Sequence, residues 1–379
     1  MQSRRRCVVL RKKRSMIIKS LSLRDFRNHE QVQFQSFSPH INVFLGKNGV
    51  GKTNLLEAIG VLATGRSFRT AKDSVMIKTG SPRAYLKLTY AGAADHAIEV
   101  LLDQQKPKSI RLSGENIRRM SELYACLPTV LFSPEDLKTV KEGPSFRRKY
   151  LDFDICRLRP AYLDTLKKYQ QLLAQKNAAL KAGAEDTLIG VYNEQLSEQI
   201  FQIERTRLHY AAELSRTATR ALKSMGKTDA VEISLTSPFI TQSGVAEQQE
   251  IFAVLQNALA RERFEKTSVL GAHRDDVAFY LNGRDARLYA SQGEARTLML
   301  SLKFAAVKLI RDVLQTDPVL MLDDVFSDLD ALRQKWVLKN ARDLQTFLTL
   351  AEDRIELGEE DKVFLLTEEG IFERKTRTE

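Results

Sequence analysis

Eight consecutive residues near the start of the chain have the types and spacing that hold a phosphate group. They match the pattern G-x-x-x-x-G-K-[ST] and are Gly46, Lys47, Asn48, Gly49, Val50, Gly51, Lys52 and Thr53. In such a loop backbone N–H groups surround the anion, and the glycines allow close approach and positive φ. We predict that Lys52 reaches the β- and γ-phosphates of a nucleotide and that Thr53 ligates Mg²⁺.

The residues on either side predict the elements that a phosphate loop requires. The apolar run at 41–45 indicates a buried strand, and residues 54–59 open a helix. The alternative is a glycine-rich turn that contains Gly-Lys-Thr by chance. Such a turn would account for neither the strand nor the helix.

A pair of carboxylates follows a second apolar strand near the other end of the chain. Residues 317–322 lead directly into Asp323 and Asp324, which we call the acid pair. The first carboxylate would hold Mg²⁺ through water, and the second would orient the attacking water. Two acids at a strand end could also form an ordinary exposed turn.

A third segment argues against that turn. Ser291, Gln292, Gly293 and Glu294, the signature segment, begin a long amphipathic helix about thirty residues upstream of the acid pair. Residues 327–330 follow at the spacing of the loop after the second acidic motif in ABC-type ATPases. In those ATPases such a helix start faces a γ-phosphate held by a partner subunit. The two half-sites therefore predict ATP binding between two copies of the chain.

The hydrolytic residues differ from those of transporters. Asp324 stands where transporters carry glutamate, which predicts slow hydrolysis and a switch rather than a motor. No histidine follows the strand at 346–350, so Thr349 is a candidate substitute for the γ-phosphate sensor. Residues 133–136 are where we look for a Q-loop equivalent.

Hydrophobic periodicity predicts an α/β fold, an ABC-type ATPase head built from both chain ends with a mostly helical second lobe inserted. Two long helices are expected at 162–182 and 188–225, and a final hairpin at 369–370. The expected divisions are a basic extension that could be disordered at 1–15, the first part of the head at 16–130, the helical lobe at 131–264 and the second part of the head at 265–379.

Composition argues against a membrane or secreted protein. No apolar run approaches the roughly eighteen residues of a membrane span, and the run at 7–10 is too short for a secretory signal. Cys7, Cys126 and Cys156 lie far apart without metal-binding spacing, as expected for reduced thiols. We therefore expect a cytoplasmic protein.

The net charge of +11 is concentrated at the start of the chain. Seven basic residues lie within the first fifteen, and removing them leaves +4. This arm is either a DNA-binding extension or the product of an upstream start codon. DNA binding must therefore rest on local patches, each of which could equally be solvated or salt-bridged surface. The candidates are Arg66, Arg69 and Lys72; Arg111, Arg118 and Arg119; and Lys138, Lys141, Arg147, Arg148 and Lys149.

Several segments together resemble the RecF family of bacterial recombination mediators, within the ABC/SMC-like ATPases. They are 16–28, the phosphate loop, 64–69, 132–137, 147–152, 271–276 and 322–327, and the resemblance spans roughly 16–370. It implies an ATP-dependent homodimer with weak DNA-dependent ATPase activity that binds gapped DNA at single-strand/double-strand junctions. It also implies work with RecR and RecO to load RecA in gap repair and the SOS response. Arg27 would contact nucleotide, as in SMC-like heads, unless it is a surface arginine.

Other interpretations explain less of the chain. A monomeric P-loop phosphotransferase for a small molecule would use Asp323 or Asp324 as base, but it has no use for the signature segment. A transporter subunit does not require the long helical insertion. His273, Asp275 and Asp276 could suggest a metal or nuclease centre, but further acids are not identifiable, so we interpret them as a charged strand entry that connects the lobes.

Overall fold

Both ends of the chain build the sheet that carries the phosphate loop. The computed structural model describes residues 14–92, 95–353 and 355–374. The central sheet has the order β19-β18-β4-β17-β16-β9, and its neighbours are parallel except β18 and β19. Its strands are β4 (Ile41–Leu45), β9 (Thr129–Phe132), β16 (Val319–Leu322), β17 (Thr346–Leu350), β18 (Lys362–Leu366) and β19 (Ile371–Arg374). The parallel order brings the carboxyl ends of β4, β17 and β16 to one edge.

A second sheet covers the helix that follows the phosphate loop. It is antiparallel, in the order β3-β2-β5-β6-β7-β8. Its strands are β2 (Ile17–Phe26), β3 (His29–Phe34), β5 (Arg83–Ala91), β6 (Asp95–Asp103), β7 (Ser109–Leu112) and β8 (Glu115–Asn116). Helix α1 (Lys52–Thr64) shares one core with both sheets, through residues such as Leu55 and Ile59. Since β4 is buried along its whole length, its sequence is a continuous apolar run with one buried asparagine.

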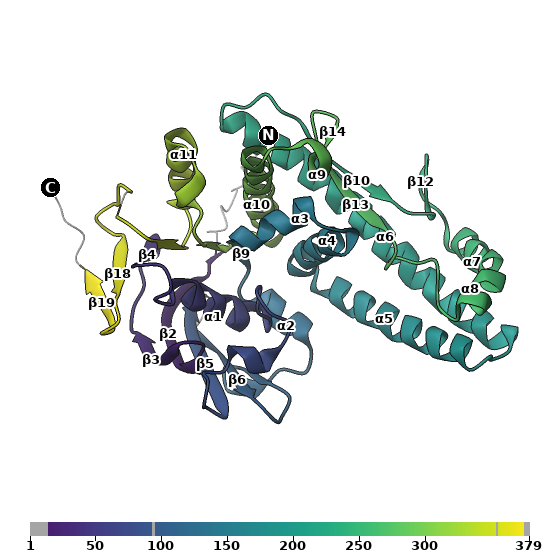
Figure 1. Ribbon diagram of the computed structural model, residues 1–379, viewed down its shortest axis with the longest axis horizontal. Coiled ribbons are helices and arrows are strands. Elements are labelled where there is room, and N and C mark those ends of the chain that lie inside the picture. The colour runs from purple at the N-terminus through teal and green to yellow at the C-terminus, as the bar shows by residue number, and fades with distance from the viewer. Residues whose placement is uncertain (1–13, 93–94, 354, 375–379) are drawn as a thin grey trace, which may run out of the picture.

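The inserted lobe is mainly helical and extends away from the head (Figure 1). Its helices are α4 (Pro144–Leu158), α5 (Pro160–Lys181), α6 (Asp186–Ser224), α7 (Gln248–Asn257) and α8 (Leu259–Glu265). Helices α5 and α6 pack along each other, and Gly183 in their connection has φ 69°, a conformation that glycine adopts without strain. The two predicted long helices are confirmed to within two residues at each end.

The lobe boundaries differ from the predicted ones. Strand β13 (Asp276–Leu281) pairs with β10 (Val231–Thr236) and with β14 (Arg284–Asp285), so the inserted lobe has its own three-stranded sheet, two strands of which lie beyond residue 264. Strand β9 of the head likewise spans the boundary expected at 130/131. The alternation of apolar and polar residues in β10 is typical of a strand, but it does not identify the partner, because the pairing joins residues 40 to 50 positions apart.

The remaining elements connect these units. They are α2 (Met120–Cys126), α3 (Leu137–Lys141), α9 (Ala286–Tyr289), α10 (Gln292–Leu314), α11 (Ala331–Ala341), the 3-10 turns η1 (Asp73–Met76), η2 (Pro134–Asp136) and η3 (Phe326–Asp328), and the short strands β1 (Arg14–Ser15), β11 (Ile240–Thr241), β12 (Gly244–Val245) and β15 (Thr316–Asp317). Most of the basic extension lies outside the described residues, but its last two residues, β1, pair with β15. None of the described helices has the length and apolarity needed to cross a membrane.

A buried set of ion pairs ties the strand entry at β13 to the helices. Arg207 of α6 is 3% exposed and donates to Asp275 at 2.6 Å and to Asp152 of α4 at 2.8 Å. Arg147 of α4 pairs with Asp276 at 2.7 Å. Buried charges are tolerated only when paired in this way. The segment is a charged strand entry as predicted, but it joins elements of the inserted lobe to one another rather than the two lobes.

His273, which lies beside these ion pairs, should stay neutral until low pH. Its Nδ1 lies 2.6 Å from the Tyr169 hydroxyl, and burial together with Arg274 lowers its pKa to about 4. We expect its C2–H resonance in NMR, assigned by its loss in His273→Gln, to titrate near pH 4. Because the folded pKa lies below the unfolded value near 6.5, its contribution to stability is present above pH 6.5 and is lost as the pH falls towards 4. A midpoint above pH 6 would contradict this account.

Candidate nucleotide site

Each glycine of the phosphate loop is required for its own structural reason. Gly49 and Gly51 have φ of 90° and 106°, a region that favours glycine, and Gly51 is the N-cap of α1. Gly46 has no positive φ, but a Cβ there would lie 2.5 Å from the Leu366 carbonyl oxygen. The loop thus closes tightly between β4 and α1, with the helix N-terminus directed at it.

The ammonium group of Lys52 is held at the loop. It donates to the carbonyl oxygens of Gly46 and, at 2.8 Å, of Lys47. Desolvation lowers its pKa, while Asp324 and Asp323 act in the opposite direction. The Lys52 ammonium group therefore lies close enough to the acid pair for both carboxylates to stabilise its positive charge.

Three distant segments meet at Asp323. The Thr53 hydroxyl donates to Asp323 Oδ1 at 2.8 Å, and the Thr349 hydroxyl donates to the same oxygen at 3.0 Å. Asp323 is 4% exposed, and burial raises its pKa. Hydroxyl and carboxylate oxygens are the hard donors that Mg²⁺ prefers, and Mg²⁺ usually binds through one or two protein ligands plus phosphates and water. The residues present therefore fit the predicted metal.

Thr349 also fixes the second acid. Its hydroxyl accepts from the backbone N–H of Asp324 at 2.9 Å, and Asp324 is exposed with φ 49°. One hydroxyl therefore sets the positions of both acids. A role for Thr349 as a substitute for the missing histidine stays a prediction.

The signature segment lies at the exposed start of α10, apart from the loop of the same chain. Ser291 is the N-cap, and its backbone N–H and hydroxyl donate to the Glu294 carboxylate at 2.8 and 2.7 Å. All four residues are exposed, and Figure 1 shows α9, which leads into them, well separated from α1. No hydrogen bond between described residues joins 291–294 to 46–53. One chain therefore keeps the signature segment apart from its own phosphate loop.

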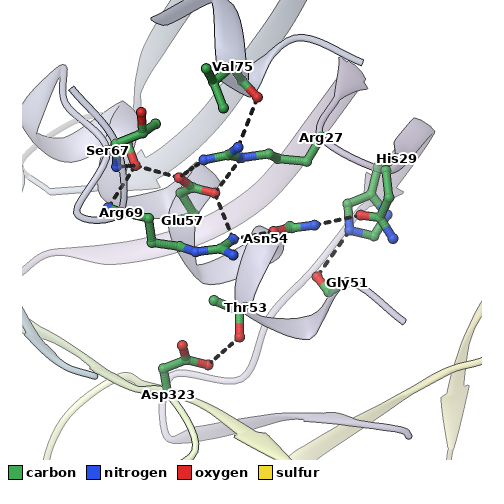
Figure 2. A network of polar contacts seen from close by, with 12 residues as sticks. Arg27, His29, Gly51, Thr53, Asn54, Glu57, Ser67, Arg69, Val75 and Asp323 are labelled. Carbon is green, nitrogen blue, oxygen red and sulfur yellow. Dashed lines mark hydrogen bonds and ion pairs between the residues drawn. The ribbon is translucent and has the colours of Figure 1, made fainter. Parts of the chain in front are cut away.

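Arg27 forms an ion pair with Glu57 of α1 (Figure 2). Its Nε and Nη2 donate to the two carboxylate oxygens of Glu57 at 2.8 and 2.6 Å. Glu57 is fully buried and also binds Arg69 and the Ser67 hydroxyl. Nucleotide contact by Arg27 stays a prediction.

Sequence reasoning missed Glu57 and the turn before β3. The signal for Glu57 was a lone acid within the apolar run that opens α1, one turn after Thr53. Asn28 in this turn donates to the Val50 carbonyl at 3.1 Å, and the ring of His29, the first residue of β3, lies 3.2 Å from the Gly51 carbonyl. These contacts brace the loop from the side of the second sheet.

Most members of the third basic patch have internal partners. Lys138 pairs with Glu135, Arg147 with Asp276, and Arg148 donates to the Asp275 carbonyl. Lys141 donates to carbonyl groups of α9. This patch is therefore a poorer candidate for DNA than its composition suggested.

Comparison with known proteins decides the family. Residues 17–364 match the model described as RecF/RecN/SMC N terminal domain. The DNA replication and repair protein RecF of Clostridium tetani is 39% identical over 342 residues, covering 88% of this chain and 92% of that protein. The protein of the same name from Lachnoclostridium phytofermentans is 37% identical over 341 residues, with the same coverage. The chain belongs to the RecF family.

Solved structures agree with this assignment. A structure of the recombination mediator protein RecF-ATP in the RecFOR pathway superposes with a TM-score of 0.88 at 30% identity, covering 95% of this chain and 98% of that one. An Smc head domain from Pyrococcus furiosus reaches a TM-score of 0.55 at 15% identity, which shows a shared fold alone. Family membership and the related ATP-bound structure imply that this chain binds a nucleotide, and the loop and acid pair described above are the candidate site.

Replacing Thr349 by valine should slow hydrolysis while sparing ATP binding. Valine keeps the shape but leaves the Asp324 N–H unpaired and removes a donor to Asp323, an effect of about 1–3 kcal/mol, or roughly 5- to 150-fold. Single-turnover hydrolysis and equilibrium ATP binding would be measured for both proteins. Thr349→Ser, which keeps the hydroxyl, should stay near the wild-type rate. Hydrolysis by Thr349→Val at the wild-type rate would contradict the assigned role.

Proposed function

We propose that this chain is an ATP-driven, DNA-binding recombination mediator whose two copies close around nucleotide. This proposal rests on one observation: the signature segment is exposed and separate from the phosphate loop of its own chain. A second copy would supply the missing half-site, with Ser291 and Gly293 facing the γ-phosphate bound by Lys52 of its partner. The dimer would then depend on the triphosphate, because the γ-phosphate is the group that both copies contact.

Within each composite site the residues would divide the work. Thr53 and Asp323 would hold Mg²⁺, which would neutralise phosphate charge when bound. Asp324 would orient the attacking water, and its short, exposed side chain favours slow hydrolysis and a long-lived closed state. Hydrolysis would remove the shared γ-phosphate and reset the dimer.

The substrate and partners follow from the family. The curated relatives are named DNA replication and repair protein RecF, and the related solved structures are of a recombination mediator in the RecFOR pathway. We extend this to gapped DNA with single-strand/double-strand junctions, to RecR and RecO, and to loading of RecA in the cytoplasm. A monomeric phosphotransferase would leave the exposed signature segment without a role.

Ser291→Arg should abolish ATP-dependent dimerisation and the DNA binding that follows it. The arginine side chain is much larger than serine and would occupy the place of the γ-phosphate held by the partner copy. The mutant should therefore bind ATP but stay monomeric. Molecular mass in solution would be measured with ADP and with ATP, each with and without a gapped duplex. The wild type should dimerise with ATP only.

The matched control is Lys335→Arg on α11, an exposed position that the proposed sites do not use. It should behave as the wild type. A wild type that stays monomeric with ATP, or a Ser291→Arg variant that dimerises normally, would overturn the proposal.

A further inference from the structure

One lysine outside the candidate nucleotide site donates to the backbone of the segment that leads into Ser291. Lys141, the last residue of α3, directs its ammonium group at the carbonyl oxygens of α9. The Nζ lies 3.4 Å from the Ala286 oxygen, 3.5 Å from the Arg287 oxygen and closest to the Ala290 oxygen. Among the described residues, no ion pair joins Lys141 to a carboxylate.

These contacts fix the path of the chain immediately before the signature segment. Helix α9 has only four residues: the Ala290 N–H closes its one turn on the Ala286 carbonyl, and the Arg287 and Ala290 carbonyls lie at its C-terminal end. A cation at a helix C-terminus satisfies such carbonyls and interacts favourably with the local dipole. The other end of α9 is held by Asp285, whose carboxylate accepts from the Arg287 N–H at 2.7 Å. Since Ala290 directly precedes Ser291, the lysine sets the direction in which the chain enters α10.

The same charge acts on the capping box of α10. The pKa of Glu294 is lowered, first by the hydrogen bonds from Ser291 and also by Lys141. An ionised Glu294 is the acceptor that holds the Ser291 hydroxyl and N–H. Since an exposed glutamate is ionised at neutral pH even without Lys141, loss of the lysine would loosen Ser291 mainly from the Ala290 side.

The other end of α3 is anchored near the acid pair. Helix α3 follows η2 and β9, and β9 pairs with β16, the strand that ends at Asp323. Asp136 of η2 forms an ion pair of 2.6 Å with Lys303 of α10, a largely buried contact. Helix α3 therefore bridges the edge of the sheet that carries the acids and the helix that carries the signature segment.

The surface around α9 also exposes large apolar side chains. Leu288 and Tyr289 are 67% and 69% exposed, although both are large and apolar, and they lie three and two residues before Ser291. Neighbouring exposed apolar side chains of this kind commonly mark an interface. In the proposed dimer, the surface that faces Ser291 belongs to a second copy of the chain.

We propose that Lys141 is a positioning residue for the nucleotide held by the partner copy, acting through the signature segment. This inference rests on the ATP-dependent dimer proposed above. Lys141 itself touches neither nucleotide nor the phosphate loop of its own chain. Its loss should weaken dimer closure and leave ATP binding by the monomer intact.

Lys141→Met keeps the aliphatic stem and removes the charge and the donor. We expect its ATP-dependent dimer dissociation constant to rise at least about tenfold, which corresponds to about 1.4 kcal/mol. ATP affinity at monomeric concentrations and the melting temperature should stay at wild-type values. Lys141→Arg, which keeps charge and donors, should recover most of the dimerisation. Lys181→Met, at the distant end of α5, removes an exposed lysine as a charge control and should have no effect.

A mixing experiment separates action through the signature segment from general damage. Lys141→Met retains its phosphate loop, and Lys52→Met retains its signature segment, so each should dimerise poorly alone. A mixture of the two should form a heterodimer with one intact composite site. The mixture of Ser291→Arg with Lys52→Met is the reference and should behave in the same way.

The outcomes distinguish this inference from the proposed function. If the wild type and the reference mixture dimerise with ATP but Lys141→Met equals the wild type, Lys141 has no positioning role. If the reference mixture dimerises and the Lys141→Met mixture does not, the lysine acts on the whole fold, which also overturns the inference. If the wild type itself never dimerises, the proposed function fails first, and the inference fails with it.

Discussion

The hydrogen bond between Thr53 and Asp323 joins residues 270 positions apart at a distance of 2.8 Å, and the candidate nucleotide site depends on it. It exists only because β4 and β16 flank β17 in one parallel sheet, so the loop after β4 and the acids after β16 open at the same edge. The entropic cost of closing a long loop grows only logarithmically with its length. A whole helical lobe can therefore lie between the two halves of the head without separating them.

A second buried contact keeps the loop helix in place. Glu57 is fully buried one turn after Thr53, and such a carboxylate is tolerated because Arg27 binds it in bidentate fashion and Arg69 approaches at 3.4 Å. These partners come from the turn after β2 and from the segment after α1. The ion pairs of Glu57 hold the helix that follows the loop, and Asn28 and His29 contact the loop backbone itself. The N–H groups of the loop are therefore already arranged for an anion.

The sequence predicted the parts of the site that are local in the chain. The loop pattern, the start of α10 at the signature segment and the two long helices depend on neighbouring residues, and the structure has them where they were expected. What sequence did not reveal depends on tertiary contacts. The pairing of β13 with β10, the ion pairs of Glu57 and the dual role of the Thr349 hydroxyl each join distant segments. For Gly46, the reason for glycine is the carbonyl of Leu366, which no local pattern contains.

The central claim is that the phosphate loop of one copy faces the signature segment of another, and proximity crosslinking tests it most directly. Two variants, Asn48→Cys and Gln292→Cys, would be made in a chain whose three native cysteines are replaced. They would be mixed and treated with a short bismaleimide. The account predicts a covalent dimer with ATP, little with ADP, and none when Lys52→Met is added to the loop variant. A crosslink that forms equally with ADP, or none with ATP, would contradict the shared site.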